Sequence, residues 1–534
     1  MHGKIVVVTG KLAMEEAERQ VELLNKAGYN VKLKVFNIDV AVFINEKNLA
    51  SWINKFCSDL KGSVIVIPGG SHVRSDIFYT LLRCKDVRVV KGPIHISDLY
   101  HYSTAIPLGD WMLDHPVDRL HECEKRSSTM GAYRKMLSES KGLRSVHSNI
   151  VIPIKPPPFI PIGELYIDSY FGKYFEDKLG WLINSEFPII VVGSLRNDSS
   201  AVEKAVRTVE KEGFNGILGI DLPPSCKSIR LITNTSAELF LSLNSHAFGK
   251  LEECIKAVRN SIMPVIIPSN IRGSRRSKLY SLGRGVKKAG NIGLSRIILD
   301  PIISPPYSNA NTSVLDALLV SRTVNEKYGK PVLLGLSNYI ELVDSDSPGL
   351  VFSLVQLAVE AKASLGLFSE ESYKTQGVLQ EAFLAAAMNS YSAMHKIPPK
   401  DIGVNLLVLK SKKRIENNIT GRVKVLEREG GEQPIGEWDP TGYVNIIVDY
   451  KRRLILTKKK KWKHWIGSTE WRPIIDYLIE NNEISRIGHA FYLGRELYKA
   501  TLALKLNKNY IQDERLFTKN YLKGLEKEEK DFEI

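Results

Sequence analysis

The sequence predicts an α/β fold in which a central (β/α)8 TIM barrel is flanked by an N-terminal flavodoxin-like α/β domain and a small C-terminal α+β domain. Two observations predict the barrel. Short apolar runs between residues 163 and 370 alternate with amphipathic stretches of helix length, which is typical of parallel strands buried on both faces. Most of these runs end in an acidic or amide residue, where barrel enzymes carry their functional groups.

The count of apolar runs distinguishes the barrel from its main alternative, a doubly wound open sheet. Both folds show the same strand–helix alternation. Two runs lie at 163–169 and 187–194, and the others end at or near Asp221, Asn244, Asn270, Asp300, Asn338 and Glu370. Because an open sheet of this many strands is less usual, the count favours the barrel.

Length and local composition divide the chain into four segments. At 534 residues the chain is long enough for about three domains. We expect an α/β domain over residues 1–125, a proline-rich connector over 126–162, the barrel over 163–415 and the C-terminal domain over 416–534. A helix is expected over 375–394, followed by a further strand within 401–414.

Composition indicates a globular chain outside the membrane. The apolar fraction is 43% and the charged fraction 25%, which are ordinary values for a soluble domain. No apolar run approaches the ~18 residues of a membrane span. The N-terminal apolar run is too short and too soon charged for a signal peptide, so we expect a cytoplasmic location.

The cysteines are expected to be small buried thiols. They are Cys57, Cys84, Cys123, Cys226 and Cys254. None forms a Cys-x-x-Cys pair, so the spacing indicates neither a metal site nor a redox motif.

The N-terminal segment carries two glycine-rich strand ends that could cradle an anion. Val8-Thr9-Gly10-Lys11 and Pro68-Gly69-Gly70 each follow an apolar run. Neither completes a phosphate-binding fingerprint, so tight turns are the favoured interpretation.

The C-terminal segment contains a basic stretch, residues 458–463, with Trp462 and Trp465 nearby. Lysine mixed with aromatic side chains is found on nucleic-acid-binding surfaces. Lysines also protect exposed hairpin edges, and this second interpretation is favoured. The net charge of +15 does not decide between them.

Asp221, Asn244, Asp300 and Asn338 are the candidate site residues, because the predicted barrel would bring them to one mouth. A carboxylate accepts the paired N–H donors of an amino-pyrimidinone edge, and an asparagine offers a donor and an acceptor together. Each residue could instead cap the helix that follows its strand. Four such residues at equivalent positions favour a ligand site for a flat nitrogen heterocycle.

The motifs ILGID, LFLSLN and RIILDP resemble the strand ends of the pterin-binding barrel family, which includes dihydropteroate synthases and methyltetrahydropterin methyltransferases. The likeness covers about residues 163–409. The whole chain resembles archaeal dihydropteroate synthase-related proteins through KGP at Lys91-Gly92-Pro93, GLSNYIELVDSDS in the barrel and HAFYLGRELYKA in the tail.

This resemblance implies a small-molecule pterin partner, with a reduced pterin as substrate or cofactor. Asp221, Asn244 and Asp300 fall on the positions that hold the pterin ring edge. Asn338 resembles the methyltransferase asparagine near the reactive nitrogen, so Asp300 and Asn338 are the candidate catalytic residues. The tail motif makes His489 the histidine of interest.

Three departures from the synthase pattern concern the groups that hold diphosphate and the arylamine. The first strand is followed by LYIDSYFG, the seventh by Ser337-Asn338-Tyr339, and the eighth reads LGLFSEES. Without that anion clamp the charge developing on diphosphate has no obvious stabiliser. Mg²⁺ is expected only if a diphosphate substrate is used.

Three functions therefore stay open. The chain could condense a hydroxymethyl-dihydropterin diphosphate with an arylamine, transfer a methyl group from a reduced pterin to a corrinoid or thiol, or bind a pterin without turnover. A homodimer is compatible with the sequence. No membrane partner is expected, and no recognised motif supports nucleic-acid binding.

Overall fold

A computed structural model describes residues 4–169, 174–307, 314–409, 439–514 and 516–517. Its largest sheet has eight strands in the order β12-β11-β10-β9-β8-β7-β14-β13, and all the pairings between them are parallel. The strands are β7 (Ile160–Tyr166), β8 (Ile189–Gly193), β9 (Ile217–Asp221), β10 (Ala237–Asn244), β11 (Met263–Ile267), β12 (Ile298–Leu299), β13 (Leu333–Gly335) and β14 (Leu365–Ser369).

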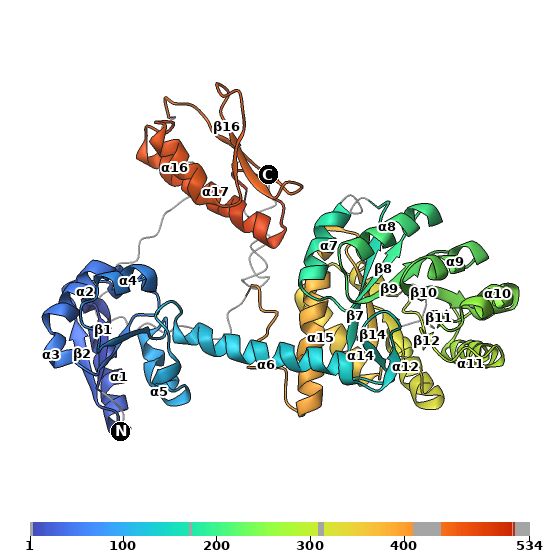
Figure 1. The fold of residues 1–534 in the computed structure, drawn as a ribbon. Helices are drawn as coiled ribbons and strands as arrows, with labels where there is room; N and C mark the ends of the chain where they lie inside the picture. Colours follow the sequence, from blue (N-terminus) through green and yellow to red (C-terminus); the bar gives the residue numbers. More distant parts are fainter. Residues whose placement is uncertain (1–3, 170–173, 308–313, 410–438, 515, 518–534) are drawn as a thin grey trace, which may run out of the picture. The chain divides into compact units, whose positions relative to one another are not determined.

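The sheet closes into a barrel. A parallel bridge joins Leu299, at the end of β12, to Val332, directly before β13, and the Leu299 N–H donates to the Pro331 carbonyl at 3.0 Å. Helices surround the strands (Figure 1). The (β/α)8 barrel predicted from the apolar runs is confirmed, and the open sheet is excluded.

The barrel helices follow the strands in chain order. They are α7 (Phe175–Asn184), α8 (Ser199–Lys211), α9 (Cys226–Asn234), α10 (Ser245–Val258), α11 (Arg275–Asn291), α12 (Val314–Tyr328), α13 (Ser337–Ile340), α14 (Ser347–Glu360) and α15 (Val378–His395). Their apolar faces and the strands share one continuous core. Each strand therefore ends at the same mouth as its neighbours, with a helix leading away from it.

Two expectations at the barrel's ends were wrong. The first strand begins at Ile160, inside the expected connector. There Pro161 pairs only with β14, and pairing with β8 starts at Ile162. Proline is tolerated at such a strand start, so it did not end the pairing. The strand expected within 401–414 is not formed over residues 401–409. Residues 410–414, and the expected boundary at 415, lie outside the described residues.

The connector region contains α6 (Val117–Glu139) and a hairpin of β5 (Gly142–Arg144) and β6 (Val151–Pro153). The hairpin bonds to the start of β10, where the buried Glu238 accepts from Ser145 and the Val146 N–H and pairs with Arg296 at 2.6 Å. These contacts lie at the amino-terminal ends of the strands, opposite the mouth.

The N-terminal domain has a four-stranded parallel sheet in the order β2-β1-β3-β4. Its strands are β1 (Ile5–Thr9), β2 (Val31–Val35), β3 (Val64–Ile67) and β4 (Arg88–Lys91), and its helices are α1 (Met14–Lys26), α2 (Glu46–Lys55), α3 (Cys57–Leu60), α4 (Ser75–Leu81) and α5 (Leu99–Ala105). Separate apolar clusters form on the two faces of the sheet, so helices cover both, as in flavodoxin-like domains.

The C-terminal domain forms a second compact unit. An antiparallel sheet of β15 (Asn445–Asp449), β16 (Leu454–Lys458) and β17 (Ile466–Ser468) packs with α16 (Trp471–Glu480) and α17 (Ile487–Leu506) around its own core. This is the α+β arrangement of a hairpin and two helices expected from the sequence.

The prediction of small buried thiols was wrong for all five cysteines. Disulfides join Cys57 to Cys84 and Cys226 to Cys254, with Cα–Cα distances of 5.6 and 5.5 Å, whereas Cys123 is free and exposed. The bonded residues are 27 and 28 positions apart. Each bond therefore joins two successive strand–helix repeats that lie side by side. A search for short cysteine motifs does not detect such a pairing.

Among the described helices, none combines the length and the apolar character needed to cross a bilayer.

Candidate functional site at the barrel mouth

The mouth holds the four predicted residues in unequal settings. Asp221 and Asn244 are the last residues of β9 and β10, and Asp300 directly follows β12. The prediction that Asn338 ends a strand is wrong. Strand β13 stops at Gly335, and Asn338 lies in the short helix α13. Asp300 is 6% exposed, whereas Asn338 is exposed.

Asp300 begins a turn that is held from three sides. Its Oδ1 accepts from the Ile302 N–H at 2.7 Å. The Ile302 carbonyl accepts from Lys278 Nζ of α11 at 2.8 Å, and the Ile303 carbonyl accepts from Asn338 Nδ2 at 3.3 Å. The turn therefore connects the sixth strand with groups that follow the fifth and seventh strands.

This turn is strained. Ile302 has φ +58°, a conformation in which a β-branched residue is an outlier. Such strain persists where the surroundings enforce it, and it is frequent at ligand sites. In the same loop the buried Ser304 hydroxyl has no hydrogen-bond partner among the described residues.

Burial governs the charges here. It raises the pKa of Asp300 to about 7, against the opposing effects of the Ile302 N–H and the positive charge of Lys278. Burial lowers the pKa of Lys278, and Asp300 partly offsets that change. Asp300 therefore gains or loses its proton near neutrality, as an acid tuned for ligand chemistry does.

Asp221 belongs to a second group with Glu164 and Tyr166, both from β7. The Tyr166 hydroxyl lies 2.8 Å from Asp221 Oδ2 and 3.1 Å from Glu164 Oε1. Burial raises the pKa of Glu164, and the neighbouring Asp221 charge raises it further. Burial also raises the pKa of Asp221, although hydrogen bonds from Tyr166 and Glu164 lower it. The pKa of Glu164 is raised more than that of Asp221, so Glu164 holds a proton more readily than its neighbour.

Asn244 follows an irregularity in β10. The pairing of β10 with β11 shifts register between Phe240 and Leu243, and Ser242 there has φ +65°. Bulges of this kind redirect side chains at barrel rims. The Asn244 Oδ1 accepts from the N–H groups of His246 and Ala247 at 3.0 Å. Asn244 thus caps α10, the structural role weighed against a binding role.

Glu164, Tyr166 and Lys278 were missed in the sequence. Glu164 stands in an apolar strand, and Gly163 faces Phe187 and Leu379 outside the barrel, so alternation turns Glu164 inward. An acid inside a buried strand was the signal for this group. Nothing local marked Lys278, whose position depends on the Asp300 turn.

The rim after β13 and β14 is acidic. The Glu371 N–H donates to Glu341 at 3.0 Å, and Glu370 pairs with Lys178 at 3.3 Å. Burial raises the pKa of Glu371 and that of Glu381, the latter to about 7. Within the described ranges, no group of three His, Cys, Asp or Glu side chains is arranged to hold a metal ion.

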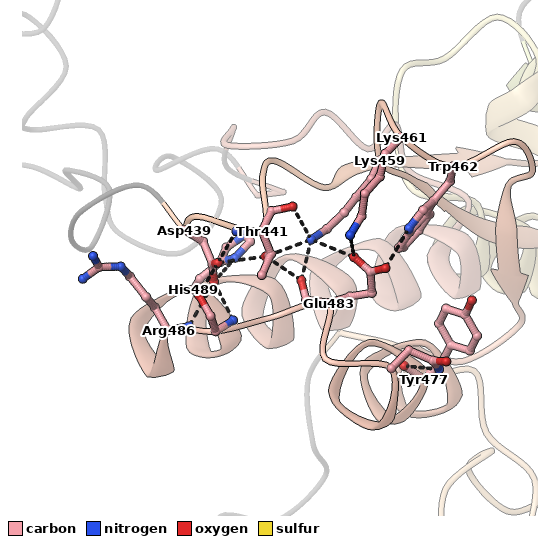
Figure 2. Close-up of polar contacts among 11 residues, drawn as sticks. Asp439, Thr441, Lys459, Lys461, Trp462, Tyr477, Glu483, Arg486 and His489 are labelled. Atoms are coloured by element: carbon pink, nitrogen blue, oxygen red, sulfur yellow. Dashed lines mark hydrogen bonds and ion pairs between the residues drawn. The ribbon is translucent and has the colours of Figure 1, made fainter.

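The C-terminal domain contains a separate polar network (Figure 2). Lys459 Nζ donates to the Thr441 carbonyl at 3.0 Å, to the Thr441 hydroxyl at 2.9 Å and to the Glu483 carbonyl, and it pairs with the Glu483 carboxylate at 3.2 Å. Its side chain is 2% exposed. The interpretation of residues 458–463 as one solvated lysine surface is therefore wrong for Lys459.

Asp439 organises the other half of the network. Its carboxylate accepts from the N–H groups of Thr441, Ser485 and Arg486, and His489 Nδ1 lies 3.0 Å from its Oδ2. Hydrogen bonds from Ser485 and Thr441 hold the pKa of Asp439 far below its usual range despite the opposing effect of burial. His489 therefore joins the start of α17 to the segment before β15.

Comparisons with known proteins agree with this architecture. Residues 438–513, the C-terminal domain, match the family described as PterinBD-DUF4346. The chain is 26% identical over 540 residues to the uncharacterized protein MJ0107 of Methanocaldococcus jannaschii, covering 96% of this chain and 99% of that one.

Solved structures with a similar fold include dihydropteroate synthases. The Coxiella burnetii enzyme in complex with pteroic acid is 16% identical, covers 44% of this chain and 92% of its own, and has a TM-score of 0.35. The Yersinia pestis enzyme is 12% identical, covers 46% and 95%, and has a TM-score of 0.35. The family match covers the C-terminal domain alone, and its description agrees with the resemblance to pterin-binding proteins that the sequence motifs indicated.

Proposed function

We propose that the barrel mouth binds a reduced pterin by the edge of its ring, and that the protein acts in archaeal pterin metabolism of the methanopterin or sulfopterin type. The observation that carries this proposal is a pair of acids, the buried Asp300 and the partly buried Asp221, at the ends of strands six and three. The relative from Methanocaldococcus jannaschii supports the archaeal setting.

Asp300 accepts the paired N–H donors of the amino-pyrimidinone edge. Its carboxylate retains acceptor capacity beyond the bond from Ile302, because an ionised carboxylate has about four lone-pair sites. The Ser304 hydroxyl, which is buried without a partner among the described residues, is satisfied by a polar ring atom. Asp221 and Asn244 bond the remaining nitrogens, Asn244 through its amide donors while its oxygen caps α10.

The leading reaction is the synthase-like condensation. The arylamine nitrogen forms a bond to the pterin methylene carbon, the bond from that carbon to diphosphate oxygen breaks, and the amine loses a proton. The mouth contributes by holding the ring so that the methylene faces the amine, which lowers the barrier through proximity. Mg²⁺ would enter only with the diphosphate substrate, where it would offset the negative charge of the phosphate oxygens.

Methyl transfer from a reduced methylpterin is the second candidate, and the acidic rim favours it. Glu341, Glu370, Glu371 and Glu381 offer no positive charge to a diphosphate leaving group, and Lys178 beside them is paired with Glu370. Arg275, which could have clamped that anion, is paired with Asp316 at 3.2 Å. Asn338, next to the Asp300 turn, lies where it could bond a pterin nitrogen as its charge changes.

One set of mixtures tests these proposals. The purified chain is combined with 6-hydroxymethyl-7,8-dihydropterin diphosphate and 4-aminobenzoate with Mg²⁺, and released diphosphate is measured. Release above the buffer blank supports the condensation. A spectral change of cob(I)alamin on addition of methyltetrahydropterin supports methyl transfer instead. Ring binding without either reaction assigns a non-catalytic binding protein, and no ring binding contradicts the whole proposal.

Replacing Tyr166 with phenylalanine is expected to weaken pterin binding about ten-fold at neutral pH. The change removes the hydroxyl proton donated to Asp221, so the pKa of Asp221 rises further and less of its carboxylate is ionised. Titration calorimetry with 7,8-dihydropterin measures the affinity of both proteins.

Tyr339→Phe is the matched control, because Tyr339 lies in α13 near the mouth and donates to neither carboxylate. Its affinity should stay near that of the unaltered protein. Equal losses in the two variants would show that Tyr166 has no special part in binding.

A further inference from the structure

The N-terminal domain has a cavity of its own. It measures about 260 Å³ and lies at the carboxyl ends of β1 and β3, between the loops that follow β2 and β4. Gly92 and Pro93 of the KGP motif form part of its wall. None of the barrel-mouth residues lines it, so it is separate from the pterin site.

Its position follows from the order of the strands. In the strand order β2-β1-β3-β4, the chain leaves β1 towards β2 at one edge of the sheet and leaves β3 towards β4 at the other edge. The loops that follow β1 and β3 therefore diverge. Ligands of open α/β sheets bind in the crevice that this divergence leaves at the strand ends. The cavity lies at that point.

Glycines bring the loops together around the cavity. A Cβ on Gly10 would lie 2.7 Å from the Asp39 carbonyl oxygen, and a Cβ on Gly69 would lie 2.6 Å from the Gly92 carbonyl oxygen. Both contacts are shorter than real Cβ atoms show. Only glycine therefore allows these backbones to approach so closely, which explains the two glycine-rich strand ends in the sequence.

Thr9 contributes a polar side chain to the lining of the cavity. Thr9 is 2% exposed and is one of the lining residues. Its side chain lies on the same face of β1 as Ile5 and Val7. Its hydroxyl makes none of the side-chain hydrogen bonds found among the described residues. It is also not one of the fully enclosed side-chain atoms that lack a partner, so it is open to the cavity, where a water or a ligand can bond it.

The lining excludes a phosphate ligand. The first amides of the β1 turn are already used, because the Lys11 and Leu12 N–H groups donate to the carbonyls of Ile38 and Asp39. No lysine or arginine is among the described residues that line the cavity. The anion cradle considered from the sequence is therefore wrong for this turn.

The remaining walls are apolar. They include Val8, Val40, Val42, Ile94 and Leu99, and Asp39 and His95 also line the cavity. Apolar walls with one polar group suit an uncharged ring. Pockets for drug-sized molecules start at about 300 Å³, so this smaller cavity suits a compact ligand.

We propose that this cavity binds an uncharged ligand of about one or two fused rings, held by its apolar walls and by one hydrogen bond to Thr9. The KGP motif and both glycine-rich strand ends serve this site. The inference is independent of the pterin proposal.

The probe is 5-fluoroindole, a neutral bicycle with one N–H donor, observed by ¹⁹F NMR on the full chain. Excess 7,8-dihydropterin is present so that the barrel mouth is occupied. The unaltered protein should bind the probe at concentrations below about 1 mM. Thr9→Val, which keeps the shape and removes the acceptor, should bind it about three- to ten-fold more weakly.

Ala13→Trp should abolish binding, because Ala13 lines the cavity and is half-buried, so the indole side chain can fill the space. Glu18→Trp, on an exposed position of α1, is the control and should bind normally. 5-Fluoroindole-2-carboxylate should bind at least about ten-fold more weakly than the neutral probe, since the charge would lose its hydration. Absent binding, equal binding by Ala13→Trp, or preference for the carboxylate would each overturn the proposal.

Discussion

Replacing Asp300 with asparagine is expected to weaken reduced-pterin binding more than a hundred-fold. The carboxylate accepts two N–H donors from the ring edge, whereas an amide offers one oxygen and turns an NH₂ group towards the second donor. Hydrogen bonds to a charged group contribute about 1.5–3 kcal/mol each, so two correspond to about 3–6 kcal/mol. Titration calorimetry with 7,8-dihydropterin measures the change.

The pH dependence of binding gives a second readout. With a pKa of about 7, Asp300 is only partly ionised near neutrality. The ring donors require the ionised form, so affinity of the unaltered protein should rise between about pH 6 and about pH 8 and then level off. The Asp300→Asn variant lacks the titrating group, so this rise should be absent from it.

Protein stability supplies a test that needs no ligand. The folded pKa of Asp300 lies above the ordinary value of 3.8, so the folded state binds more protons than the unfolded state between these two values. Its contribution is most favourable below about pH 4 and is lost as the pH rises to about 7. Compared with the Asp300→Asn variant, the unaltered protein should lose unfolding free energy across this window.

Asp198→Asn is the control for Asp300→Asn. Asp198 lies at the same end of the barrel and caps α8 through Ser200 and Ala201, a role that asparagine fills equally well. Its pterin affinity should be unchanged. If both variants lose affinity alike, or if Asp300→Asn loses none, the assignment of the ring edge to Asp300 is wrong.

Replacing Lys459 with methionine is expected to destabilise the C-terminal domain by about 1–3 kcal/mol, the cost of leaving buried acceptors without their donor. The ammonium bonds the carbonyls of Thr441 and Glu483 and the Glu483 carboxylate. Methionine is unbranched and only one atom shorter, but it leaves the two carbonyls without this donor. The Glu483 carboxylate keeps Lys461 at 2.8 Å and the Trp462 indole N–H at 3.1 Å. Hydrogen exchange of the amides in α16 and α17 measures the loss.

The adjacent Lys460 offers a matched control, because it is exposed. Lys460→Met should change the unfolding free energy by less than about 0.5 kcal/mol, as surface substitutions do. Similar protection factors in the two variants would contradict the structural role of Lys459. If both variants retained less nucleic acid and neither was destabilised, a nucleic-acid-binding surface would be favoured instead.

The barrel could be predicted from the sequence because its strands are short, apolar and repeated. Buried parallel strands need apolar side chains on both faces, so each one leaves a visible run. Asp221 and Asn244 were placed correctly at strand ends for the same reason. Asn338 was misplaced because β13 stops at Gly335 and the apolar Leu336 continues the run into α13.

The electrostatic partners of the site could not be predicted. Tyr166 and Asp221 are 55 positions apart, and their contact exists only because β7 and β9 lie either side of β8 in the closed sheet. Lys278 contacts the Asp300 turn by donating to a backbone carbonyl. Every residue has such a carbonyl, so the amino-acid sequence does not reveal this bond. The same holds for Lys459, whose burial distinguishes it from the exposed lysine beside it.

A crystal structure of the protein soaked with 7,8-dihydropterin tests the central claim most directly. The ring should lie in the barrel mouth, with the Asp300 carboxylate within hydrogen-bond distance of two ring donors and Asp221 bonded to a further nitrogen. A ring bound elsewhere, or a mouth that stays empty at saturating pterin, would contradict the account.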